Sequence, residues 1–150
     1  MNLDEFLDIA RGLPGVEVST PGPGSPAPEI AWGDSFIALA DADPTRQFPF
    51  ATVVTKDYPD VDTASRLDRP GVFRLNFGVG RAEYERLLGH LPGAAAEQAV
   101  DPAGIGVLIP HPIYASHAWV SIVCAGEVPA IAEQLLVVAH ARAVKQHVRK

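Results

Sequence analysis

The sequence contains one cysteine and no long apolar run, and these two absences narrow the class of protein. One cysteine cannot form an intramolecular disulfide, and it cannot supply a cysteine zinc cluster. No apolar stretch approaches the roughly 20 residues that a membrane-spanning helix requires. The first residues, MNLDEFLDIA, carry acids where a secretory signal carries basic residues. We therefore expect a cytoplasmic protein without a membrane segment.

Positive charge is also scarce. The chain has 12 Lys and Arg against 18 Asp and Glu, which gives a formal net charge of −6. Binding to a phosphate backbone depends on Lys and Arg neutralising phosphates. The acidic balance therefore argues against nucleic acid as a partner. The basic end of the chain, ARAVKQHVRK, is explained by the preference for cations at the C-terminus of a helix.

The length and the hydrophobic content favour one globular domain over residues 1–150. The chain has 150 residues, of which 47% are hydrophobic and 20% are charged. A chain of this size buries roughly two thirds of its unfolded surface, so it can form a stable core without disulfide bonds or a structural metal. We find no internal repeat.

Two segments alternate between apolar and polar residues, as strands with one packed and one open face do. In the first, Phe73, Leu75 and Phe77 share one face, and Arg74 and Asn76 lie on the other. The second segment, HAWVSIVC, repeats the pattern over residues 117–124. Its predicted core face holds Ala118, Val120, Ile122 and Cys124, and its predicted open face holds His117, Trp119, Ser121 and Val123.

Helical spacing marks three further segments. Residues 2–11 have Asn2 as N-cap and acids in the first turn, residues 81–90 follow a glycine turn, and a last helix starts near Val128. Residues 29–40 are predicted to form a hairpin around Gly33-Asp34, with Ile30 and Trp32 on its first strand. Residues 50–55 are predicted to form a central strand, and residues 105–109 another strand.

This order predicts an α+β fold. We expect a single antiparallel sheet of about five to six strands, in the order α-β-β-β-β-α-β-β-α, with the helices packed on one face. Residues 20–28 are predicted to be a solvated connector. Residues 56–70 are predicted to be a polar, irregular connection punctuated by two prolines.

Two patterns invite a metal or anion site, and each has a simpler interpretation. Asp57, Asp60 and Asp62 do not match a calcium loop, so we interpret them as turn and cap residues and expect no metal and no cofactor. Gly78-Val79-Gly80 precedes a helix, as in anion cradles. It lacks the rest of a phosphate loop, and Glu83 would repel an anion, so we predict a tight strand-to-helix turn.

The open face of the predicted sheet favours a binding module for a small polar or anionic ligand. Arginine and asparagine offer hydrogen bonds, and tryptophan offers stacking. The candidate ligand-binding residues are Arg69, Arg74, Asn76, His117, Trp119 and Ser121. For each of these, packing or pairing with a nearby carboxylate is the alternative. For Arg69 and Arg74, the candidate partners are Asp57, Asp60 and Asp68.

Two other functions stay open. A small hydrolase or isomerase could use His111 and His117 as general acid and base, with Asp57 or Asp68 orienting one of them. No nucleophile motif accompanies them, and Cys124 falls on the predicted core face. Alternatively, the open face and Trp119 could pack against a second copy, which would make the protein a homodimeric assembly protein.

Several segments resemble a known family. These are LPGV, WGDSFIAL, the stretch from FATVV to NFGVG, and HPIYASHAWVSIV. Together they resemble a family of bacterial proteins of unknown function, most specifically at SRLDRPGVFRLN and HPIYA. The element order also resembles the MmcQ/YjbR-like fold. Some members of that wider group have been proposed to bind DNA, which the acidic balance of this chain does not favour. The resemblance assigns no catalytic residues.

Overall fold

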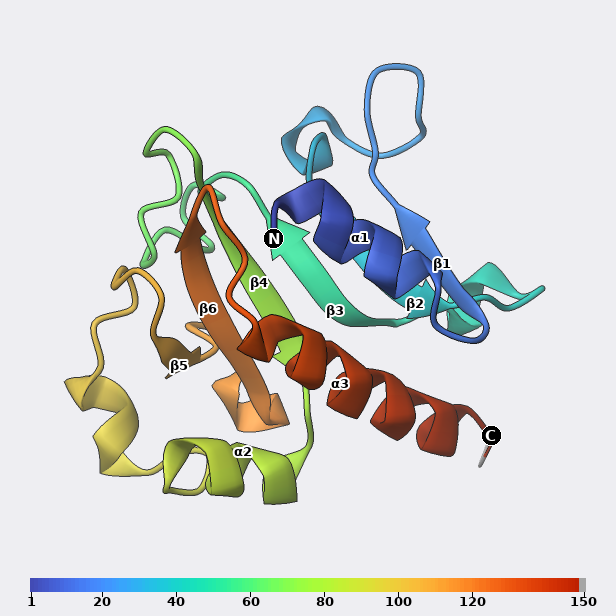
Figure 1. Cartoon of the computed structure of the whole chain (residues 1–150). Helices are drawn as coiled ribbons and strands as arrows, with labels where there is room; N and C mark the ends of the chain where they lie inside the picture. Colours follow the sequence, from blue (N-terminus) through green and yellow to red (C-terminus); the bar gives the residue numbers. More distant parts are fainter. Residues whose placement is uncertain (149–150) are drawn as a thin grey trace.

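The computed structural model describes residues 1–148 and arranges them as three helices and six strands (Figure 1). The order is that predicted from the sequence. The elements are α1 (Leu3–Arg11), β1 (Val16–Ser19), β2 (Ser35–Leu39), β3 (Pro49–Val54), β4 (Val72–Gly78), α2 (Arg81–Leu88), β5 (Leu108–Pro110), β6 (Trp119–Ala125) and α3 (Ile131–Val148). Short 3-10 helices lie in the connections.

The strands form one antiparallel sheet in the order β1-β2-β3-β4-β6-β5, which confirms the α+β fold. Helices α1 and α3 cross the same face of this sheet, and α2 lies at its end near β5 (Figure 1). The predicted core face is confirmed, because Phe73, Leu75 and Phe77 belong to the core under the helices. The predicted core face of β6, from Val120 to Cys124, belongs to it too. The opposite face of β4 was predicted to be open, and this is wrong, because all seven residues of the strand are buried.

The first strand of the predicted hairpin over residues 29–40 is wrong. Glu29–Ala31 forms a 3-10 helix, in which the Ala31 and Trp32 amides donate to the carbonyls of Pro28 and Glu29. Strand β2 has only two edges, and these pair with β1 and β3. Segment 29–32 therefore satisfies its hydrogen bonds locally. The turn itself needs a positive φ at Gly33, as predicted, and the angle is 86°.

Strand β6 starts two residues later than predicted. His117 ends a short 3-10 helix, and Ala118 adopts the left-handed conformation with φ 61°, which interrupts an extended chain. The strand predicted over 105–109 is present but short and shifted, because β5 starts at Leu108. These two shifts leave residues 111–118 as a turn beside the open face of the sheet.

Candidate functional site

The sheet face opposite α1 and α3 holds a cavity of about 580 Å³, which we call the open-face pocket. Its polar lining comes from three places. Thr52, Arg74 and Asn76 come from β3 and β4, Asp62 from the 56–70 connection, and His111 from the turn before β6. The cavity therefore depends on two connections that fold back over the strands.

Arg74 is fully buried and forms the centre of the polar floor. Its two terminal nitrogens donate to both carboxylate oxygens of Asp62, at 2.9 and 2.5 Å. A further N–H donates to the Ser65 hydroxyl at 3.1 Å, and Nε donates to Asn76 Oδ1 at 2.8 Å. The bidentate ion pair with Asp62 compensates the charge of the Arg74 guanidinium, which has no access to water.

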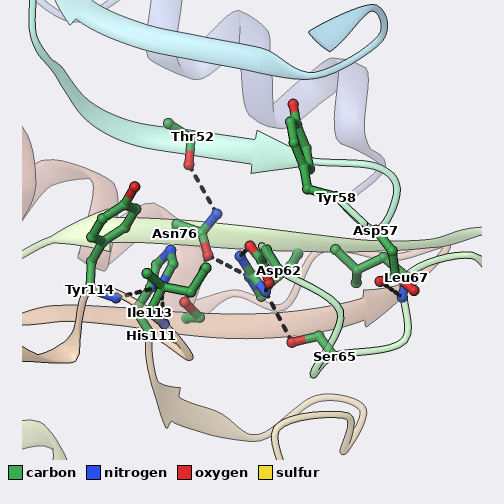
Figure 2. Close-up of polar contacts among 12 residues, drawn as sticks. Thr52, Asp57, Tyr58, Asp62, Ser65, Leu67, Asn76, His111, Ile113 and Tyr114 are labelled. Atoms are coloured by element: carbon green, nitrogen blue, oxygen red, sulfur yellow. Dashed lines mark hydrogen bonds and ion pairs between the residues drawn. The ribbon is translucent and has the colours of Figure 1, made fainter. Parts of the chain in front are cut away.

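Asn76 connects three strands. Its Oδ1 accepts from Ser121 Oγ of β6 at 2.7 Å, in addition to the bond from Arg74. Its Nδ2 donates to Thr52 Oγ1 of β3 at 2.9 Å (Figure 2). Because Oδ1 accepts two hydrogen bonds and Nδ2 donates one, the orientation of the Asn76 amide is fixed.

His111 is held in one tautomer by its own turn. The backbone amides of Ile113 and Tyr114 both donate to its Nδ1, each at 3.0 Å, so the ring proton lies on Nε2 (Figure 2). Burial, together with the charge of Arg74, lowers the pKa of His111 to about 3, although the charge of Asp62 opposes the shift. The ring is therefore a neutral hydrogen-bond donor at physiological pH.

Aromatic side chains form one wall of the open-face pocket. The ring centroid of His111 lies 4.9 Å from that of Tyr114 and 6.1 Å from that of Trp119, the latter edge-to-face. Trp119 pairs in register with Gly78, and a Cβ on Gly78 would lie 2.9 Å from the indole. The glycine therefore lets the indole lie directly against the backbone of β4.

A second polar cluster fixes the start of the 56–70 connection. Asp34 is buried and accepts from the Thr55 amide at 2.8 Å, from Lys56 Nζ at 3.1 Å and from the Tyr58 hydroxyl. Burial and the bond to Asp34 raise the pKa of Tyr58 well above its usual value. Tyr58 lines the open-face pocket, so this cluster positions part of its wall.

Most of the predicted ligand-binding residues lie together. Arg74, Asn76, His117 and Trp119 line the open-face pocket, and Ser121 lies in the buried network of its floor. Arg69 does not join them. Its guanidinium donates to the carbonyls of Ser65, Arg66 and Ala103, so it stabilises the 56–70 connection.

The aspartates take one role that was predicted and one that was not. The partner of Arg74 is Asp62, and not one of the three predicted candidates. Asp57 accepts from the Leu67 amide, as the interpretation of Asp57, Asp60 and Asp62 as turn and cap residues expected, whereas the pairing of Asp62 departs from it. Asp68 accepts from the Asp57 amide. Neither bonds to His111 or His117. Sequence reasoning also missed Thr52, although its place opposite Asn76 follows from the register of β3 and β4.

Residues 1–148 contain no group of three or more His, Cys, Asp or Glu placed to hold a metal. Within the same residues, no helix is both long and apolar enough to cross a membrane. Gly78 and Gly80 form the predicted strand-to-helix turn. The acid of that turn, Glu83, pairs with Arg86 on the same helix.

Comparison with known proteins places the chain in one family. The model of a family of unknown function, DUF6194, matches residues 1–150, so the chain belongs to that family. No curated protein and no solved structure matches it. The resemblance to the MmcQ/YjbR-like fold therefore stays a prediction.

Proposed function

We propose that this member of DUF6194 is a binding protein for a small organic ligand, which occupies the open-face pocket. The observation that carries the proposal is the cavity itself. It measures about 580 Å³, and its aromatic walls converge on a buried polar floor. Ligand sites have volumes of roughly 300–1,000 Å³, with apolar walls and a few fixed polar groups.

The free hydrogen-bonding groups of the pocket indicate the chemistry of the ligand. Among residues 1–148, the His111 Nε2–H and the Trp119 indole N–H have no hydrogen-bond acceptor. The acceptors of the floor, Asn76 Oδ1 and the Asp62 carboxylate, are already engaged. A pocket that offers donors fits a ligand with acceptor atoms. The aromatic walls favour a planar ring.

The same contacts support binding over acid–base catalysis. A general base needs a free lone pair, and Nδ1 of His111 is occupied by two amides. A general acid near neutral pH needs a pKa near 7, and that of His111 is about 3. His117 is exposed, and burial raises the pKa of the Cys124 thiol to about 11. We therefore do not propose a reaction.

A fluorescent probe tests the proposal with a matched pair of variants. Val54 lines the open-face pocket, whereas Val137 is 49% exposed on α3 and does not line this pocket. The probe is phenylnaphthylamine, which is neutral, planar and fluorescent in apolar sites. We expect Val54→Phe to fill the pocket and weaken binding by about tenfold or more, and Val137→Phe to bind like the wild type.

Equal dissociation constants for the wild type and both variants would overturn the proposal. The natural ligand can then be sought by thermal shift against a metabolite collection, because a ligand that binds only the native state raises the melting temperature. A true ligand of the open-face pocket raises the melting temperature of Val137→Phe but not that of Val54→Phe.

A further inference from the structure

We infer that the ligand is an organic anion whose oxyanion group contacts Arg142 in a second hollow beyond Trp119. This inference rests on the proposed function and adds the class of ligand. The second hollow, which we call the end hollow, measures about 210 Å³. It is lined by Arg46, Phe50, Gly78, Trp119, Arg142 and His147, among others.

The end hollow and the open-face pocket are neighbours. Both are lined by Phe48, Pro49 and Trp119. These residues lie at one end of the sheet, where β3 begins, β4 ends and β6 begins. Trp119 therefore lines both a mostly apolar cavity and one of mixed polar and apolar lining, so a single ligand that lies along Trp119 can contact both.

The glycines of the Gly78-Val79-Gly80 turn make room for this arrangement. A Cβ on Gly78 would lie 2.9 Å from the Trp119 indole, and a Cβ on Gly80 would lie 2.7 Å from Nε of Arg142. A real Cβ atom essentially never makes a contact this short. The turn therefore does not cradle an anion itself. It admits the indole and the guanidinium that line the end hollow.

The charges around the end hollow favour an anion. Among residues 1–148, Arg142 has no hydrogen bond and no ion pair. Within the described residues 1–148, the carboxylate that pairs with lining residues is that of Asp41, which lies 3.4 Å from Arg46 and 3.2 Å from His147. Two arginines thus face one carboxylate, and this local excess of positive charge occurs in a chain of net charge −6. A guanidinium without a partner matches a carboxylate, sulfonate or phosphate.

Two probes with the same ring skeleton test the inference. Anilinonaphthalene sulfonate carries an anionic group, and phenylnaphthylamine does not. We expect Arg142→Gln to weaken binding of the sulfonate by about tenfold and to change binding of the neutral probe by less than about twofold. Lys145→Gln removes a charge one turn further along α3, at an exposed position that lines neither cavity, and should change neither constant.

Arg142→Lys, which keeps the charge, should restore much of the sulfonate affinity, and melting temperatures confirm that each variant folds. If Arg142→Gln weakens both probes or neither, the inference is wrong. Loss of neutral-probe binding in Val54→Phe would still support the proposed function. If neither probe responds to Val54→Phe, the proposed function fails as well. If the sulfonate responds to Arg142→Gln but not to Val54→Phe, the end hollow binds anions separately, which also overturns the inference.

Discussion

At the scale of single residues, two backbone amides decide the chemistry of His111. The Ile113 and Tyr114 N–H groups both point at Nδ1, and a protonated Nδ1 could not accept them. The side chain is only 4% exposed, so water cannot replace these bonds. The turn and the burial therefore act in the same direction and keep the imidazole neutral. The neutral ring carries an N–H on Nε2 and lines the open-face pocket.

This arrangement predicts how stability depends on pH. The pKa of His111 falls from 6.5 in the unfolded chain to about 3 in the folded protein. Between these values the unfolded state binds one more proton, so the free energy of unfolding decreases as the pH falls. The slope is up to about 1.4 kcal/mol per pH unit. Above the unfolded pKa, this contribution is complete and constant.

Urea unfolding from about pH 7.5 to about pH 4.5 measures this slope. His111→Asn is the matched variant, because its side-chain oxygen can accept the same two amides but does not titrate. We expect the free energy of unfolding of this variant to fall less steeply with decreasing pH than that of the wild type. Parallel profiles would show that His111 titrates alike in both states.

The residue scale also shows why part of the site could be predicted. A period of two places Arg74 and Asn76 on the face opposite Phe73, and this holds wherever one face is buried. The partner of Arg74 could not be predicted in the same way. Asp62 reaches Arg74 only because the 56–70 connection folds over the sheet, and its start is fixed by Asp34, a residue remote in sequence.

At the scale of elements, the glycine that ends β4 controls the position of Trp119. The φ of Gly78 lies outside the left-handed region, so alanine can adopt its backbone conformation. The added Cβ would nevertheless meet the indole at 2.9 Å and displace it. We expect Gly78→Ala to lower the free energy of unfolding by about 1–3 kcal/mol, as overpacking does, and to weaken binding of both probes.

Gly22→Ala is the matched control, because a Cβ at that position meets nothing within 4 Å. Urea unfolding and probe titration should leave this variant close to the wild type. If Gly78→Ala also left the free energy of unfolding and the probe affinities unchanged, the position of Trp119 would not depend on the glycine. The role of Trp119 between the two cavities would then need another explanation.

Elements whose signals are local were predicted well. Helix α1 begins at its predicted cap, where Asn2 Oδ1 accepts from the Glu5 amide at 2.8 Å and Glu5 accepts in return from the Asn2 amide. The prediction of a hairpin over residues 29–40 was wrong because a turn signal in the sequence does not show which edges of β2 are already paired with other strands. Strand β1, which takes the edge assigned to residues 30–32, is only four residues long and carries a weak signal.

At the scale of the whole molecule, the two faces of the sheet are covered unequally. Helices α1 and α3 cover one face (Figure 1), while the other is covered by two connections that leave the open-face pocket between them. Apolar side chains at its mouth are exposed, with Phe48 at 68%, Val61 at 69% and Tyr114 at 51%. Exposed apolar groups around a cavity fit ligand entry, and they would also fit a second copy of the chain.

Light scattering at micromolar concentration separates these two uses of the open face. A pocket that takes its ligand from solution must stay accessible, so we expect a mass of 15.9 kDa, that of one chain. Val61→Lys places a charge at the mouth of the pocket and should leave this mass unchanged. A doubled mass that returns to 15.9 kDa in Val61→Lys would make the open face a dimer interface. In that case the neutral probe should dissociate the dimer, because both would compete for the same apolar surface.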